Sequence, residues 1–151
     1  MRFLIVSGGE ATDEFVENVI KRGGYDVILA ADSGMDFLYR TKILPDIIVG
    51  DFDSVDPEVL EFFREHEEID ICALNPVKDD TDTEFAIRES IRRGATEITI
   101  IGGTGTRLDH VLGNISLLGI GLEEDVRMEL LDANNRIRMT DHSVVLKKKQ
   151  Q

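Results

Sequence analysis

The sequence has few of the residues that define several large classes of protein. Cys72 is the single cysteine among 151 residues, which excludes an intramolecular disulfide and a multi-cysteine zinc site. Tryptophan is absent, and no apolar run approaches the roughly 20 residues of a membrane span. The first apolar run meets Gly8-Gly9 too early for a signal peptide. We therefore expect a reduced, cytoplasmic, globular protein with no membrane contact.

Basic residues are scarce relative to acidic ones. Lysine and arginine total 17 against 30 aspartates and glutamates, so the net charge is -13 at pH 7. A protein that holds a nucleic-acid backbone needs the opposite balance, so nucleic acid is excluded as the main partner. The chain is 42% hydrophobic, which is enough to bury a core. Its length suits one domain and the start of a second, and its excess of carboxylates suits a divalent metal site.

Over residues 1–122, short apolar runs alternate with segments of helical spacing. The runs at residues 3–6, 27–30, 47–49, 69–74 and 98–101 read as buried strands. Helices are predicted between them, with Ser33, Asp56-Pro57 and Thr81 as start signals, and again at residues 108–118. Strands that alternate with helices predict an α/β domain with an open, mainly parallel sheet and flanking helices.

The pattern changes near residue 123. Residues 126–131, 136–139 and 144–146 read as strands with no helices between them. A pair of hairpin strands is not stable alone. We therefore expect residues 123–151 to be the incomplete start of an all-β domain, or to pair with another subunit.

Polar residues gather in four loops that directly follow predicted strands. In a parallel sheet these loops converge on one edge, where open α/β sheets bind ligands. The edge would bring several carboxylates beside a glycine-rich loop and Arg107. The four loops are Ala31-Asp32-Ser33-Gly34, Gly50-Asp51-Phe52-Asp53-Ser54, Lys78-Asp79-Asp80-Thr81-Asp82 and residues 102–110.

Such a group of carboxylates favours a bound cation. Unit charges about 4 Å apart repel by about 4 kcal/mol at an effective dielectric constant near 20. Grouped oxygen ligands suit Mg²⁺ together with substrate phosphates. The glycine-rich loop lets backbone N–H groups approach phosphate oxygens, and Arg107 suits a bidentate phosphate contact. The combination predicts metal-assisted phosphoryl transfer from a nucleotide.

Other interpretations fit single motifs. Asp32, Asp56 and Asp82 each suit an ordinary helix cap, and the glycine-rich loop is not a Walker A motif. The Asp51-Phe52-Asp53 segment resembles the nucleophile loop of haloacid-dehalogenase-type phosphatases, with Asp51 attacking phosphorus and Asp53 as acid/base. That interpretation leaves the glycine–arginine loop unexplained, and it puts the nucleophile strand third rather than first.

Taken in order, the four loops and Asn114 resemble thiamine pyrophosphokinase over about residues 3–120. The resemblance implies a Rossmann-like α/β catalytic domain followed by a β-sandwich, in a homodimer that uses Mg²⁺. It implies transfer of a diphosphate group from ATP to the hydroxyl of thiamine, giving thiamine diphosphate and AMP.

The resemblance also implies roles for single residues. Asp51, Asp53, Asp79 and Asp82 would hold magnesium, and the first three would act in catalysis with Arg107. The remaining expected contacts to ATP or thiamine, besides Arg107 itself, are Asp32, Ser33, Gly103, Thr104, Asp109, His110 and Asn114.

The sequence is expected to depart from this family, because we expect it to hold only the start of the β domain and it has no tryptophan. In the family the second domain supplies an aromatic surface against thiamine. A non-catalytic nucleotide-binding module therefore remains an alternative.

Overall fold

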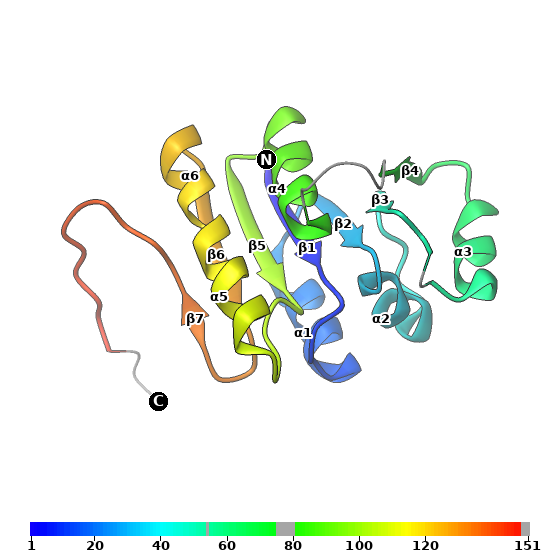
Figure 1. Ribbon diagram of the computed structural model, residues 1–151, viewed down its shortest axis with the longest axis horizontal. Helices are drawn as coiled ribbons and strands as arrows, with labels where there is room; N and C mark the ends of the chain where they lie inside the picture. The colour runs from blue at the N-terminus through cyan, green and yellow to red at the C-terminus, as the bar shows by residue number, and fades with distance from the viewer. Residues whose placement is uncertain (54, 75–80, 149–151) are drawn as a thin grey trace.

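The computed structural model describes residues 1–53, 55–74 and 81–148 (Figure 1). Its seven strands are β1 (Arg2–Val6), β2 (Val27–Ala31), β3 (Ile47–Gly50), β4 (Asp70–Ala73), β5 (Glu97–Ile101), β6 (Arg127–Leu131) and β7 (Arg136–Ile137). Its six helices are α1 (Asp13–Gly23), α2 (Gly34–Thr41), α3 (Pro57–Arg64), α4 (Asp82–Arg92), α5 (Leu108–Leu117) and α6 (Gly119–Glu124).

The strands form one sheet in the order β4-β3-β2-β1-β5-β6-β7. All neighbours pair in parallel except β6 and β7, which are antiparallel. The chain runs outward from β1 to β4, crosses back to β5 beside β1, and continues in the other direction. The predicted fold class, an open and mainly parallel sheet with flanking helices, is confirmed.

Two groups of three helices cover opposite faces of the sheet (Figure 1). Leu4 and Val6 pack with residues of α1, α2 and α3. Phe3 and Ile5, which alternate with them along β1, pack with residues of α4 and the α5–α6 segment. Burial on both faces explains why the strands read as nearly continuous apolar runs. In the described ranges, every helix is too short or too polar to cross a membrane.

The predicted helix starts have clear local causes. Asp56 Oδ1 accepts a hydrogen bond from the Glu58 backbone N–H at 2.9 Å, and Pro57 occupies the first helical position of α3. Thr81 Oγ1 accepts from the Glu84 N–H at 3.1 Å at the start of α4. Ser33 precedes α2 without a side-chain cap bond, so its predicted capping role is not seen.

The C-terminal segment differs from the prediction of a separate domain that starts at residue 123. Strand β6 pairs in parallel with β5 along its whole length, and β7 pairs with β6, so both belong to the α/β sheet. Helix α6, which the sequence did not predict, supplies part of the crossover that parallel pairing needs. The expected strand at residues 144–146 is not formed, and Val145 and Leu146 are exposed. A β domain in this region stays a prediction for residues after Ile137.

Candidate active site

The candidate site lies where the order of the strands reverses, between β1 and β5. At such a switch point the loops after the two central strands diverge and leave a crevice at the carboxyl edge of the sheet. A cavity of about 680 Å³ occupies this position. The loops after β1, β2 and β5 line it, together with the first turn of α4 and residues along the length of α5.

Glycines allow two chain segments to cross at the base of the cavity. The Ser7 N–H donates to the Ile101 carbonyl at 2.8 Å, and the Glu10 N–H donates to the Thr104 carbonyl at 2.9 Å. Gly102 between them has φ +71°, and a Cβ there would lie 1.9 Å from the Ser7 carbonyl oxygen. Gly34 is equally confined, since its Cβ would lie 1.9 Å from the Val6 carbonyl oxygen. The crossing therefore excludes side chains at both positions.

Asp32 lies at the end of β2 and is partly buried in the cavity wall. Its backbone adopts φ +48°, a left-handed conformation that aspartate tolerates better than most residues. In the described part of the chain, its buried Oδ1 atom has no hydrogen-bond partner. A buried carboxylate oxygen without a partner is costly, so this atom is suited to receive a ligand or a cation.

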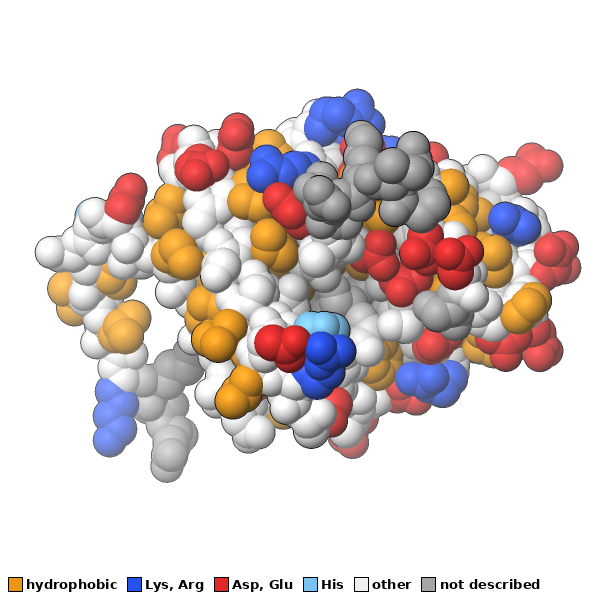
Figure 2. All heavy atoms as spheres, viewed as in Figure 1, with side chains coloured by type: hydrophobic (Ala, Val, Ile, Leu, Met, Phe, Trp, Pro, Cys, Tyr) orange, Lys and Arg blue, Asp and Glu red, His pale blue; other side chains and the backbone are white. Residues whose placement is uncertain are grey.

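Asp82, at the first position of α4, faces the same group of carboxylates. Burial, followed by the charge of Asp32 and a hydrogen bond with it, raises the pKa of Asp82 to about 6. Burial and the charge of Asp51 also raise the pKa of Asp32. Acidic side chains gather over the ends of β2 and β3 (Figure 2). Three carboxylates thus repel one another here when no cation is bound.

Asp51 and Asp53 follow β3 and are exposed. Asp51 Oδ1 accepts a hydrogen bond from the Asp53 backbone N–H at 3.1 Å, so the segment forms a tight Asx turn. Neither residue lines the cavity, although the charges of both contribute, after burial, to the raised pKa of Asp32. Among the described residues, no three His, Cys, Asp or Glu side chains lie close enough together to hold a metal ion. The predicted ligand Asp79 lies outside the described residues.

The residues after β5 form the other wall of the cavity. Asn114 Nδ2 donates to the Gly103 carbonyl at 2.7 Å, which fixes the loop against α5. Arg107 immediately precedes α5 and pairs with Asp109 through Nη2 and Oδ2 at 2.7 Å. The Arg107 guanidinium lowers the pKa of Asp109. Arg107 is two-thirds exposed, so its guanidinium is accessible to an anion.

The structure brings most of the predicted binding residues to this one cavity, although their roles stay predictions. The residues that line it are Asp32, Ser33, Asp82, Gly103, Thr104, Arg107, Asp109, His110 and Asn114. Asp51 and Asp53 lie beside it rather than in its lining.

Sequence reasoning missed the loop after β1. Ser7, Gly8 and Gly9 line the cavity, and Ser7 Oγ lies 3.1 Å from Thr83 Oγ1 on α4. A glycine pair directly after the first strand was a signal that could have found them, because phosphate-binding turns of α/β folds often occupy that position.

The fold and the site define an α/β domain with a cavity at the switch point of its sheet. The family model described as "Thiamin pyrophosphokinase, catalytic domain" matches residues 22–130. The chain therefore belongs to this family, as its resemblance in sequence implied.

Curated relatives agree with this assignment. The chain is 35% identical over 114 residues to the thiamine pyrophosphokinase of Bacillus subtilis strain 168, over 74% of this chain and 51% of the relative. It is 34% identical over 85 residues to thiamine pyrophosphokinase 1 of Oryza sativa subsp. japonica, over 52% of this chain and 32% of the relative. The chain thus spans about half the length of these relatives or less.

Solved structures show the same fold. Thiamine pyrophosphokinase from Bacillus subtilis superposes with a TM-score of 0.77 at 27% identity, over 91% of this chain and 64% of that one. A thiamin pyrophosphokinase family protein from Enterococcus faecalis gives a TM-score of 0.73 at 34% identity, with the same coverage of both chains.

Proposed function

We propose that this chain provides the nucleotide-binding and catalytic half of a Mg²⁺-dependent ATP:thiamine diphosphotransferase. The reaction transfers a diphosphate group from ATP to the hydroxyl of thiamine and releases AMP. The observation that supports it most is the cavity at the switch point. One wall carries Asp32 and Asp82, and the other carries the loop after β5 with Arg107.

The wall after β5 suits the phosphates of ATP. Glycines leave backbone N–H groups open to phosphate oxygens, and α5 begins at Leu108 without a side-chain cap on its first N–H groups. Arg107 would break its exposed ion pair with Asp109 and contact a phosphate instead. A bidentate contact of this kind is stronger than a single hydrogen bond. Asn114 would act by holding the Gly103 carbonyl, and therefore the loop, in place.

The acidic wall suits magnesium. The buried Asp32 Oδ1 has no partner in the described part of the chain, and the pKa of its neighbour Asp82 is raised. A bound cation would contact the unpartnered oxygen and reduce the repulsion between the two carboxylates. Asp51, Asp53, Asp79 and Asp82 would hold the ion, with Asp32 facing it. When bound, magnesium neutralises charge on the transferred phosphates and orients them.

The chemical step is a displacement at the β-phosphorus. The thiamine hydroxyl oxygen bonds to the β-phosphorus, and the bond from this phosphorus to the oxygen that bridges it to the α-phosphorus breaks, so AMP leaves. Arg107 would stabilise the negative charge that develops on the phosphoryl oxygens. A carboxylate of the acidic wall would accept the hydroxyl proton.

A homodimer is part of this proposal. Leu108 and Leu112 on α5 are 72% and 61% exposed beside the cavity. Large apolar side chains on one helix are suited to cover by a partner. A second subunit that covers α5 would also enclose the cavity on that side.

Product analysis tests the proposed function. Purified chain incubated with ATP, thiamine and Mg²⁺ should release AMP and thiamine diphosphate in equal amounts, measured by chromatography. Omission of thiamine or addition of a chelator should abolish both products. Release of ADP would reject a diphosphate transfer.

Two other outcomes would identify the alternatives. Tight binding of Mg-ATP with no product would identify a nucleotide-binding module. A covalent phospho-enzyme that is lost in Asp51→Asn would identify a phosphatase.

A further inference from the structure

A second cavity lies on the face of the sheet that carries α1. Residues of α1 form one wall, and β5, β6 and β7 form the other, with a volume of about 660 Å³. None of the residues that line it also lines the candidate active site. Its chemistry is therefore separate from that of the acidic cavity.

This second cavity concentrates positive charge in an acidic protein. Five arginines line it, although the chain has only 17 basic residues and a net charge of -13. Two carboxylates face them, so the lining carries a net charge of +3. The arginines are Arg2, Arg22, Arg127, Arg136 and Arg138, and the carboxylates are Glu97 and Glu129.

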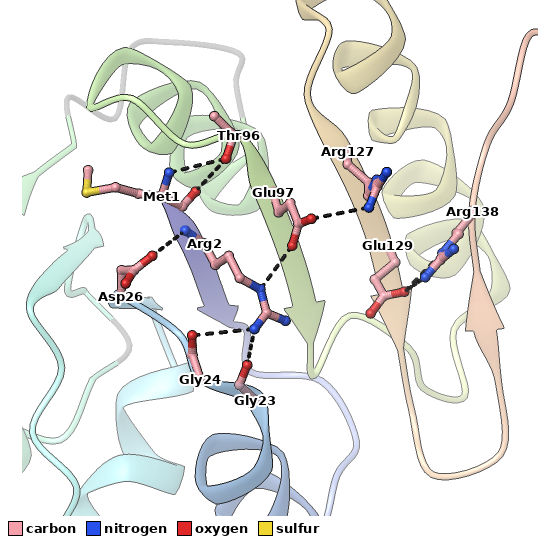
Figure 3. A network of polar contacts seen from close by, with 10 residues as sticks. All are labelled: Met1, Arg2, Gly23, Gly24, Asp26, Thr96, Glu97, Arg127, Glu129 and Arg138. Atoms are coloured by element: carbon pink, nitrogen blue, oxygen red, sulfur yellow. Dashed lines mark hydrogen bonds and ion pairs between the residues drawn. The ribbon is translucent and has the colours of Figure 1, made fainter.

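The strand register builds this lining. Arg2 on β1 is paired with Glu97 on β5, and Glu97 is paired with Arg127 on β6, so three charged side chains stand in one row across the sheet (Figure 3). The Arg2–Glu97 contact is 2.9 Å and the Arg127–Glu97 contact is 3.3 Å. One carboxylate therefore serves two guanidinium groups.

The same sharing occurs at Glu129. Arg138 Nη2 lies 2.9 Å from Glu129 Oε2, and Arg136 Nε lies 3.6 Å from the same oxygen. The Glu129 side chain is only 16% exposed, whereas the two arginines are about half exposed. The carboxylate is thus far less exposed than the two guanidinium groups that pair with it, which leaves those groups accessible to a ligand.

Three of the five guanidinium groups, those of Arg22, Arg127 and Arg136, make at most one hydrogen bond or ion pair with described residues. Arg2 also donates to the Gly23 and Gly24 carbonyls at the end of α1, so its role is structural (Figure 3). Among the described residues, the Arg22 guanidinium makes no hydrogen bond or ion pair. Arg136 makes only the long contact to Glu129, and Arg127 makes one hydrogen bond while 75% exposed.

We propose that this second cavity binds a diphosphate group. Guanidinium groups form planar pairs of hydrogen bonds with phosphate oxygens and lose less hydration than ammonium groups. An excess of +3, spread over two walls, matches a ligand with several charges better than a single phosphate. A cleft lined by one sign of charge also concentrates the opposite ion.

Binding at the second cavity needs no metal, because the arginines supply the charge. This separates the proposal from the proposed function, whose acidic site needs a cation. The diphosphate group belongs either to inorganic diphosphate or to a nucleoside diphosphate, and the two are distinguished by titration with each.

Calorimetric titration with inorganic pyrophosphate, in EDTA, tests the proposal. The unaltered chain should bind one equivalent, and the double variant Arg127→Gln/Arg136→Gln should bind at least tenfold more weakly. A parallel titration with ADP identifies the source: equal affinity assigns recognition to the diphosphate group alone, and tighter ADP binding assigns it to a nucleotide.

Two control variants make the test specific. Arg92 lies on the exposed side of α4, away from the second cavity. Like the cavity arginines, it shares one carboxylate, that of Glu89, with another arginine, so Arg92→Gln is a matched control. Asp82→Asn alters the acidic site. Both should bind pyrophosphate as tightly as the unaltered chain. Lack of binding at millimolar pyrophosphate, equal weakening by Arg92→Gln, or loss of binding in Asp82→Asn would overturn the proposal, provided circular dichroism shows every variant folded.

Discussion

Asp32 and Asp82 belong to different crossovers of the sheet, yet their carboxyl groups share a hydrogen bond. Burial, then the charge of Asp32 and this hydrogen bond, raise the pKa of Asp82. The same hydrogen bond acts against the rise in the pKa of Asp32 that burial and the charge of Asp51 cause. The pair forms because β2 ends beside the first turn of α4 on the carboxyl edge. Since the pKa of Asp82 rises from 3.8 to about 6, the folded protein keeps a proton that the unfolded chain loses at lower pH.

The free energy of unfolding should therefore fall as pH rises from about 4 to about 6 in the absence of metal. The shift corresponds to about 3 kcal/mol, and we expect about 1 to 2 kcal/mol because the two carboxyl groups are only partly buried and solvent screens them. Asp82→Asn should be more stable than the unaltered chain at pH 7 and similar at pH 4. Urea denaturation in EDTA at several pH values measures the difference. A difference that is independent of pH would contradict the shared proton.

Magnesium should stabilise the fold at pH 7.5. An ion that binds only the native state raises the melting temperature, and about 100-fold excess over Kd gives about 2.7 kcal/mol. The increase should be lost in Asp32→Asn/Asp82→Asn and kept in Glu14→Gln, which removes an acidic residue from the remote first turn of α1. Differential scanning calorimetry measures it. A melting temperature that does not respond to magnesium would contradict the metal site.

Arg107→Ala should lower kcat/KM for ATP about 10- to 1000-fold, since it removes a charge-assisted phosphate contact. The fold should change little, because the Arg107–Asp109 pair is exposed. Arg40→Ala is a matched control: Arg40 pairs with Asp13 in a similarly exposed contact, on α1 and α2. Steady-state kinetics compares the two variants. Equal effects, or none from Arg107→Ala, would place the arginine outside the site.

Gly102→Ala should destabilise the chain by about 2 to 4 kcal/mol. Its Cβ would meet the Ser7 carbonyl oxygen at 1.9 Å in a left-handed backbone conformation. Gly113→Ala on α5 is the opposite case, since nothing described lies within 4 Å of its Cβ, and it should stabilise the helix by about 0.5 to 1 kcal/mol. Thermal denaturation of both variants checks the sign of each change.

The part of the fold that depends on local pattern was predictable from the sequence. Apolar runs identified β1 to β5, and the Asp56-Pro57 and Thr81 signals identified the starts of α3 and α4. The convergence of loops at one edge followed from parallel topology alone. The family was likewise predictable, because its motifs occur in order along the chain.

Features that depend on distant pairing were not predictable. Residues 126–131 read as a strand of an incomplete all-β domain or of an intersubunit pair, and only the structure shows that residues 127–131 pair with β5. The arginine-lined cavity depends on the register that aligns Arg2, Glu97 and Arg127 across three strands, which no local pattern contains. The burial of Asp32 and Asp82, and hence their raised pKa values, also depends on elements that are distant in the sequence.

The crossing of the loops after β1 and β5 has a consequence for ligand affinity. Gly102 in the loop after β5 and Gly34 at the start of α2 hold backbone against backbone without room for a methyl group, so this close packing leaves the wall little room to rearrange. A ligand that enters the crevice then loses little free energy to the immobilisation of the protein, and more of each contact appears as affinity. The glycines thus contribute to ligand affinity by reducing the conformational entropy that the protein loses on binding.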